Sequence, residues 1–156
     1  MNSLTFESSS EEATRRFGEA LGYLLVAGDF VALSGPLGAG KTRLVKGIAR
    51  GLEVPESEPI VSPTFVLIRE YAGRVRLYHA DAYRLTSLDE LAALGLEDFS
   101  GEDGVVVLEW ADRFPPLIPP TAIQIDIESV DETRRRIRLT APETIVRAMS
   151  AFLTGE

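Results

Sequence analysis

The feature that most constrains the fold of this chain is a glycine-rich segment that begins at residue 35. Its sequence, Gly35-Pro36-Leu37-Gly38-Ala39-Gly40-Lys41-Thr42, matches the pattern G-x-x-x-x-G-K-[ST] in full. The short apolar run Phe30–Ser34 precedes it and is typical of a buried parallel strand. A helical stretch, Thr42–Arg50, follows and is expected to end at Gly51. The segment therefore predicts a strand–loop–helix unit, which is typical of an α/β fold with a parallel sheet.

Each residue type in this loop has a physical role in binding phosphate. Gly38 and Gly40 allow backbone conformations that a Cβ atom would exclude, and they let the main chain approach a ligand closely. Successive N–H groups then point toward an anion at the N-terminus of the following helix. Lys41 is expected to reach the β- and γ-phosphates, and Thr42 to offer its hydroxyl to Mg²⁺. We therefore expect a nucleoside triphosphate to bind over the set Gly38, Ala39, Gly40, Lys41, Thr42 and Arg43.

Length and composition exclude several other classes of protein. The 156 residues predict one domain, residues 1–156. The chain has no cysteine, which rules out thiolate metal sites and cysteine nucleophiles. Its net charge of −8 argues against direct binding to free nucleic acid or to anionic membranes. No apolar run approaches the roughly 18 residues of a membrane span, and no basic segment precedes an apolar stretch at the N-terminus, so we expect a cytoplasmic protein.

The remaining hydrophobic patterns complete the predicted fold. The predicted helices cover Glu11 to Leu25, Leu88–Leu94 and Pro142–Phe152, and Ser9 with Glu12 forms a capping box for the first. The predicted strands form two hairpins, Thr64–Tyr71 with Arg74–Asp81 and Ala122–Ile127 with Arg134–Leu139, and one buried strand, Val105–Leu108. The stretch from Pro115 to Pro120 is expected to be a connection that is neither helix nor strand. Together these elements predict an α/β three-layer sandwich, with a mostly parallel sheet and antiparallel edge strands.

Two acidic residues fall where magnesium–nucleotide chemistry needs a carboxylate. Glu109 directly follows the apolar run Val105–Leu108, at the carboxyl end of a predicted buried strand. Asp81 closes another predicted strand and leads into a turn. Either carboxylate could hold the metal or orient the attacking water, although an exposed strand-end acid and a turn-forming aspartate are the alternative interpretations. We expect a hydrogen-bonding role for His79, and Trp110 either packs in the core or lines the nucleotide pocket.

Motifs that the sequence lacks limit which nucleoside and which reaction we expect. An N-K-x-D motif for reading guanine cannot exist, because the only asparagine is Asn2. The stretch Asp98–Gly101 has the D-x-x-G spacing of GTPases, but no apolar strand precedes it, so ATP is the expected nucleotide. A small-molecule kinase of the same loop class is the alternative enzyme, although no lid insertion is evident and only Arg84 and Arg113 lie near the acidic motifs. A scaffold that binds ATP without turnover is a third alternative.

Four sequence blocks occur in one order along the chain. They are Gly38-Ala39-Gly40-Lys41-Thr42, Ser62-Pro63-Thr64-Phe65, His79-Ala80-Asp81-Ala82-Tyr83-Arg84-Leu85 and Leu108-Glu109-Trp110. Together the set resembles the bacterial TsaE family, the ATPase of tRNA threonylcarbamoyladenosine biosynthesis. The resemblance covers residues 38–110, and the predicted final hairpin and closing helix also fit the family's length.

The resemblance implies a P-loop fold and a slow, Mg²⁺-dependent ATP hydrolysis that partner proteins stimulate. These partners are TsaB and TsaD, which transfer threonylcarbamoyl from its adenylate to an adenosine beside the tRNA anticodon, so that tRNA is met only through the complex. By the same resemblance Thr42 and Glu109 hold Mg²⁺, and Asp81 is needed for hydrolysis. Thr64 belongs to a nucleotide-sensing switch loop over Ser62–Phe65. The implied catalytic set is Asp81, Glu109 and Lys41, and the implied nucleotide contacts add Thr64 and Trp110 to residues 38–43.

Pro36 and a run of arginines near the end of the chain are two further features of the sequence. Pro36 stands where many members of that family carry an acidic residue, and it removes one N–H near the start of the loop, so we expect little loss of phosphate binding. The run Arg134–Arg136, with Arg138, could contact tRNA. Its phase with the apolar residues Ile137 and Leu139 favours a solvent-facing strand edge instead.

Overall fold

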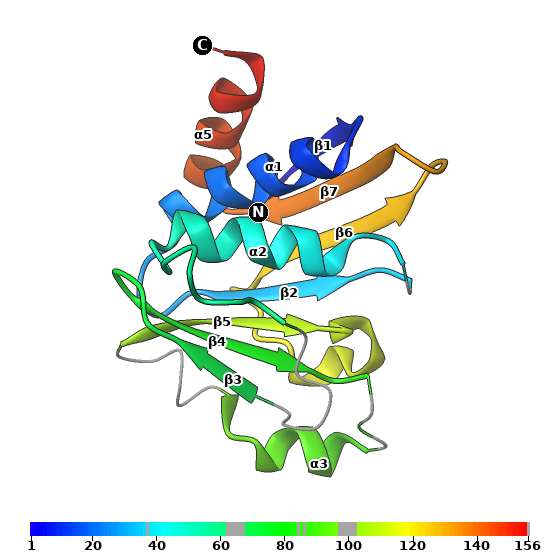
Figure 1. Ribbon diagram of the computed structural model, residues 1–156. Helices are drawn as coiled ribbons and strands as arrows, with labels where there is room; N and C mark the ends of the chain where they lie inside the picture. The colour runs from blue at the N-terminus through cyan, green and yellow to red at the C-terminus, as the bar shows by residue number, and fades with distance from the viewer. Residues whose placement is uncertain (37, 62–67, 84, 86, 97–102, 156) are drawn as a thin grey trace.

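The computed structural model describes residues 1–156 except 37, 62–67, 84, 86, 97–102 and 156 (Figure 1). The strands are β1 (Asn2–Ser8), β2 (Phe30–Ser34), β3 (Ile68–Tyr71), β4 (Arg76–Asp81), β5 (Gly104–Glu109), β6 (Ile123–Ser129) and β7 (Arg135–Ala141). The helices are α1 (Glu11–Leu24), α2 (Lys41–Gly51), α3 (Leu88–Ala93) and α5 (Glu143–Thr154), with short 3₁₀ helices η1 (Ala111–Arg113) and η2 (Pro115–Leu117). All seven strands join one sheet in the order β1-β7-β6-β2-β5-β4-β3.

The centre of this sheet is parallel and its edges are antiparallel, which confirms the predicted fold class. β2 pairs in parallel with both β5 and β6, and β4 pairs in parallel with β5. β3 closes one edge as the antiparallel partner of β4. At the other edge, β7 is antiparallel to both β6 and β1. In Figure 1, β2, β4 and β5 all end on the right-hand side, so their carboxyl ends share one edge of the sheet.

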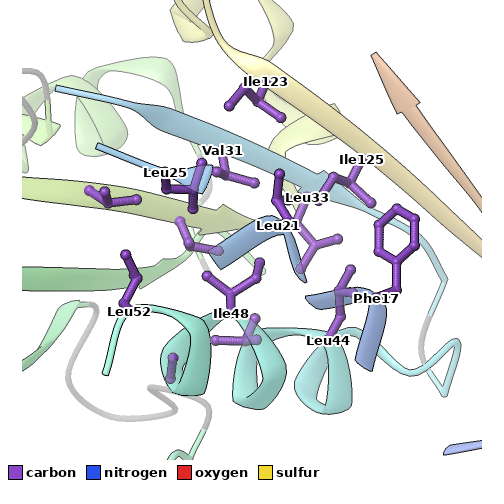
Figure 2. Close-up of a cluster of buried hydrophobic side chains, with 14 of the residues drawn as sticks. Phe17, Leu21, Leu25, Val31, Leu33, Leu44, Ile48, Leu52, Ile123 and Ile125 are labelled. Atoms are coloured by element: carbon purple, nitrogen blue, oxygen red, sulfur yellow. The ribbon is translucent and has the colours of Figure 1, made fainter. Parts of the chain in front are cut away.

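Each face of the central strands is covered by its own apolar cluster, and this makes three layers. On β2, Val31 and Leu33 join the cluster formed with α1 and α2, whereas Phe30 and Ala32 join the cluster that includes η1 residues and Phe114. Figure 2 shows the first of these clusters, with side chains of both helices meeting those of the sheet. All six residues of β5 are buried, because both of its faces are covered. The unbroken apolar run Val105–Leu108 is the sequence signature of that position.

Four glycines allow α1 and α2 to pack with their backbones in close contact. Gly18 and Gly22 lie on α1, and Gly47 and Gly51 face them from α2; a Cβ atom on Gly51 would lie 2.3 Å from the carbonyl oxygen of Glu19. Gly51 is therefore the last residue of α2 and not the residue beyond its end, as its position had suggested. The left-handed turn that follows is taken by Glu53, with φ at 66°.

The strand β1 was not predicted. It pairs with β7 along its whole length and buries Leu4 and Phe6 only in part, so its alternating pattern is weak. Because β1 extends to Ser8, the N-cap of α1 is Ser10, whose hydroxyl oxygen accepts a hydrogen bond from the Ala13 N–H. The predicted capping box on Ser9 was therefore wrong by one residue.

The proline-rich connection also differs from its prediction. Three of its residues, Pro115–Leu117, form the 3₁₀ helix η2. A proline is tolerated at the first position of a helical turn, because the N–H that it lacks has no partner there in any case. None of the helices in the part of the chain that the structure describes combines the length and the apolar character needed to cross a bilayer.

Candidate functional site

The glycine-rich loop lies between the end of β2 and the start of α2, at the edge where the parallel strands end. Gly38 and Gly40 have φ angles of 81° and 103°, and Gly40 is the N-cap of α2. Both angles lie in the left-handed region, which residues with a Cβ atom seldom adopt. The start of the loop is constrained by close packing instead, because a Cβ atom on Gly35 would lie 2.4 Å from the carbonyl oxygen of Ile127.

Lys41 places its ammonium group at the mouth of this loop. Its Nζ donates hydrogen bonds to the carbonyl oxygens of Gly35 at 2.5 Å and Pro36 at 2.9 Å, and it lies 3.8 Å from the centroid of the Trp110 ring. The residue is only 6% exposed. Burial lowers the pKa of the Lys41 ammonium group, and the carboxylates of Glu109 and Asp81 oppose that shift. A cation is thus held in a confined position that faces two acids.

Asp81 and Glu109 are brought side by side by the register of two parallel strands. Asp81 is the last residue of β4 and Glu109 the last of β5, and the two are directly paired in the sheet. The Tyr83 N–H donates a hydrogen bond to Asp81 Oδ1 at 2.8 Å. Burial raises the pKa of the Asp81 carboxyl, the Tyr83 hydrogen bond lowers it and the neighbouring Glu109 raises it further. The predicted strand ends therefore form one acidic pair next to Lys41.

His79 contacts the Glu109 side chain in the protein interior. The His79 Nε2 lies 2.5 Å from Glu109 Oε2, and the two side chains are 0% and 3% exposed. Because a carboxylate can only accept, we assign the proton to Nε2; Nδ1 has no hydrogen-bond partner among the described residues. The hydrogen-bonding role predicted for His79 is confirmed, and a buried partner of this kind fixes the orientation of the carboxylate.

Aromatic side chains line the side of the site next to β5. Trp110 follows Glu109 directly, has a left-handed φ of 60°, and contacts Tyr83 in a tilted ring pair with centroids 4.8 Å apart. Arg113 donates a hydrogen bond to the carbonyl oxygen of Tyr83. Trp110 is half-buried and touches Lys41, so it lines the candidate pocket rather than filling the core alone. Tyr83 belongs to the sequence block from His79 to Leu85, but its pattern gave no sign that its ring would contact Trp110.

The other predicted site residues are placed as follows. Thr42 lies in the first turn of α2 and is half-buried, and Ala39 is buried within the loop. The Arg43 side chain forms an ion pair with Glu11 at 3.0 Å, so it is engaged by α1. The switch segment Ser62–Phe65 with Thr64, together with Arg84 and Asp98–Gly101, lies outside the described residues.

The donor groups at this edge fit a magnesium ion that is shared with a nucleotide. Among the described residues, no group of three or more His, Cys, Asp or Glu side chains could hold a metal by itself. Mg²⁺ usually keeps several waters and binds through one or two protein oxygens plus substrate phosphates. Glu109, oriented by His79, and the hydroxyl of Thr42 at the helix start supply donors of this kind.

Comparisons with known proteins agree with this geometry. A sequence profile of the family described as "Threonylcarbamoyl adenosine biosynthesis protein TsaE" matches residues 8–137. The tRNA threonylcarbamoyladenosine biosynthesis protein TsaE of Treponema pallidum is 41% identical over 130 residues, which cover 83% of this chain and 95% of that protein. The protein of the same name from Nostoc is 44% identical over 137 residues, which cover 85% of this chain and 82% of the relative.

A solved structure gives the same result for the fold. The crystal structure of YdiB from Bacillus subtilis matches with a TM-score of 0.76 and 30% sequence identity, over 99% of this chain and 95% of that chain. The fold of this chain is thus similar to that of a solved structure over nearly the whole length of both chains. This chain belongs to the TsaE family.

Proposed function

We propose that this protein binds ATP with Mg²⁺ and hydrolyses it in support of threonylcarbamoyladenosine modification of tRNA, acting with the TsaB and TsaD proteins. The names of the relatives support the biosynthetic role. The observation that carries the chemistry is the convergence of Lys41, Asp81 and Glu109 beside the glycine-rich loop. In this proposal tRNA is reached only through the TsaB–TsaD complex, and the work is done in the cytoplasm.

Phosphate binding would rest on the loop and on Lys41. The first N–H groups of a helix have no partner within it, and the helix dipole favours an anion there. Lys41 is already confined by the carbonyls of Gly35 and Pro36, so little side-chain freedom is left to lose when phosphate oxygens replace those contacts. Trp110 would cover the same region from the opposite side and exclude water from it.

The metal would be held by Thr42 and Glu109. A bound Mg²⁺ would supply positive charge that stabilises the phosphate oxygens. The task of the chain is to present two oxygen ligands without rearrangement. His79 serves that task, because its hydrogen bond fixes one carboxylate oxygen of Glu109 in the interior.

Asp81 would act on the attacking water. Its carboxylate would accept a hydrogen bond from the water and take the proton as the new bond to the γ-phosphorus forms and the bond to ADP breaks. Because burial raises its pKa, the ionised carboxylate is a stronger proton acceptor than an exposed aspartate. Thr64, on the strength of the family resemblance, is the candidate contact that senses the terminal phosphate.

The decisive experiment is steady-state ATP hydrolysis by the purified protein, alone and with TsaB and TsaD. We expect Asp81→Asn to lower the stimulated rate by about a hundredfold or more, which is the usual contribution of a general base. Asp29→Asn is the matched control. The Asp29 carboxyl also has a pKa raised by burial and accepts a main-chain hydrogen bond, but it precedes β2 and so lies at the opposite end of that strand.

Product analysis separates the proposal from its rivals. Release of inorganic phosphate supports an ATPase, whereas a phosphorylated small molecule would identify a kinase. Nucleotide-dependent binding to the partners without turnover would indicate a scaffold. Full stimulated turnover in the Asp81→Asn variant would remove Asp81 from the mechanism.

A further inference from the structure

The hairpin of β6 and β7 supports the glycine-rich loop from beneath at both of its ends. A Cβ atom on Gly35 would lie 2.4 Å from the carbonyl oxygen of Ile127 on β6. At the other end, a Cβ atom on Gly40 would lie 3.5 Å from the Ile127 side chain and 3.8 Å from Nε of Arg135 on β7. The hairpin comes late in the sequence, yet it contacts the early glycine-rich loop: Arg135 and Ala39, which share a hydrogen bond, are 96 positions apart.

Arg135 makes the polar part of this contact. Its Nε donates a hydrogen bond to the carbonyl oxygen of Ala39 at 3.0 Å. One terminal nitrogen of the same guanidinium donates to the carbonyl oxygens of Asp131 at 2.8 Å and Arg134 at 3.0 Å, within the hairpin turn. Arg135 therefore links the turn and the loop through a single planar group, and the planar group restricts how far either can move.

The neighbouring arginines Arg134 and Arg136 form ion pairs away from the glycine-rich loop. Arg134 pairs with Asp131 at 2.6 Å, and Arg136 pairs with Glu7 and Glu128 on the opposite face of the strand. Side chains alternate between the two faces of a strand, so Arg135 shares the face of the buried Ile137, under the loop. The run that suggested tRNA contact from sequence is thus divided between separate partners.

The bond to Ala39 controls a peptide group that matters for phosphate binding. The carbonyl oxygen of Ala39 and the N–H of Gly40 belong to the same trans peptide, and they point in opposite directions across its plane. Because the carbonyl oxygen of Ala39 is directed to Arg135 on β7, the Gly40 N–H is directed to the other side of that peptide, away from β7. This peptide joins Ala39 to Gly40, whose φ of 103° lies in the left-handed region, and the glycine on that side offers little resistance to rotation of the peptide.

From this geometry we propose that Arg135 is a positioning residue for nucleotide binding, which holds the Ala39–Gly40 peptide with its N–H toward the phosphates. The inference rests on the proposed function, because it concerns the same phosphate site. Arg135 does not need to touch the nucleotide, since its three acceptors are main-chain carbonyl oxygens. Its role is to prevent a rotation that would point a carbonyl oxygen at a phosphate.

The test compares three variants by calorimetric titration with MgADP and MgATP. Arg135→Ala should raise the dissociation constant for both nucleotides by about tenfold, the effect of losing one hydrogen bond from a charged donor. Arg135→Lys keeps a positive charge and one donor but cannot bridge the turn and the loop, and it should restore binding in part. Arg138→Ala is the matched control, because Arg138 lies on the same strand with its side chain on the exposed face.

A second readout follows the peptide without any nucleotide. The amide resonance of Gly40 in a ¹H–¹⁵N spectrum of the ligand-free protein should shift or broaden in Arg135→Ala and stay in place in Arg138→Ala. Unchanged affinity together with an unchanged Gly40 resonance would overturn the role of Arg135. If the parent protein binds neither nucleotide, the proposed function itself fails, and the Gly40 resonance then judges the positioning role alone.

Discussion

The two halves of the single sheet differ in how many of their side chains are buried. In the parallel half, β2, β4 and β5 are covered on both faces, and all six residues of β5 are buried. The other half is called the antiparallel half here, although β6 pairs in parallel with β2 as well as antiparallel with β7; β6 and β7 bury alternate residues and leave the others partly or fully exposed. The exposed face there borders an open groove of about 790 Å³ that extends to the start of the glycine-rich loop. That outer face carries polar side chains along its length, whereas on the described strands β2, β4 and β5 the fully buried polar residues are His79 and Glu109.

A buried pair and an exposed pair show what this difference means energetically. The His79 and Glu109 side chains are 0% and 3% exposed, whereas those of Arg136 and Glu7 are 47% and 57% exposed. Removing polar or charged groups from water is costly, so a buried pair persists only with good geometry and seldom for stability alone. Exposed pairs contribute little because water and salt screen them. We therefore expect the buried pair, rather than the exposed one, to serve the proposed function, and four predictions test this difference.

The largest expected effect is on stability, from removing one member of the buried pair. His79→Leu would leave the Glu109 carboxylate without its partner, and we expect a loss of about 3 kcal/mol in the free energy of unfolding. The measurement is urea denaturation followed by circular dichroism. The double variant His79→Leu with Glu109→Met should recover much of the loss, because apolar groups then replace both partners. A single variant as stable as the parent would show that the buried pair does not differ from the exposed one.

The second prediction concerns activity and uses the two lysines of the chain, Lys41 and Lys46. Lys41→Ala should lower ATP hydrolysis by roughly 10²–10³-fold, because it removes a positioned cation from the phosphate site. Lys46→Ala, five residues along the same helix, should change the rate little, since Lys46 is not among the groups at the carboxyl edge. Steady-state release of phosphate measures both, and equal rates in the two variants would contradict the role of the parallel edge.

The third prediction addresses the exposed half. Arg136→Ala removes two surface ion pairs, with Glu7 and Glu128, and should lower the free energy of unfolding only slightly, because water screens both pairs. The difference between variant and parent should shrink as salt is raised, because screening weakens surface pairs. The same urea denaturation, repeated at low and high salt, provides the measurement. A larger and salt-independent loss would mean that the antiparallel half also relies on charge.

The smallest expected effect concerns pH: the contributions of Asp81 and Asp131 to folding stability should change with pH in opposite directions. Burial raises the pKa of Asp81 above 3.8, so folding stability from this group should fall as pH rises from 3.8 through the folded-state value. The hydrogen bond from Arg134 lowers the pKa of Asp131 to about 2, so its contribution is present above 3.8 and is lost as pH falls toward 2. Asp81→Asn and Asp131→Asn should therefore change the acid stability profile in opposite directions. Carboxyl ¹³C titration by NMR gives the two pKa values directly, and shifts of the same sign would refute the comparison.

Much of the parallel half could be predicted from the sequence because its signals are local. Continuous apolar runs predict buried strands, and a glycine-rich loop before a helical pattern predicts the turn between strand and helix; these signals lie in Phe30–Ser34, in the loop after it and in Val105–Leu108. β1 escaped prediction because Leu4 and Phe6 alternate with polar residues in a short segment, and only β7 gives it a partner. The cap on Ser10 was misplaced for the same reason, since the preceding strand sets where the helix begins.

The candidate site also combines features with local sequence signals and features that depend on long-range contacts. The glycine-rich loop and the acids at two strand ends could be read from the amino-acid sequence, because loop geometry and strand burial depend on residues that are neighbours in the chain. Three contacts needed the folded chain: the pairing of Asp81 with Glu109, the hydrogen bond between His79 and Glu109, and the hydrogen bond from Arg135 to Ala39, 96 positions away. Those contacts depend on strand order and on which face a side chain occupies, and both are set by burying the whole sheet at once.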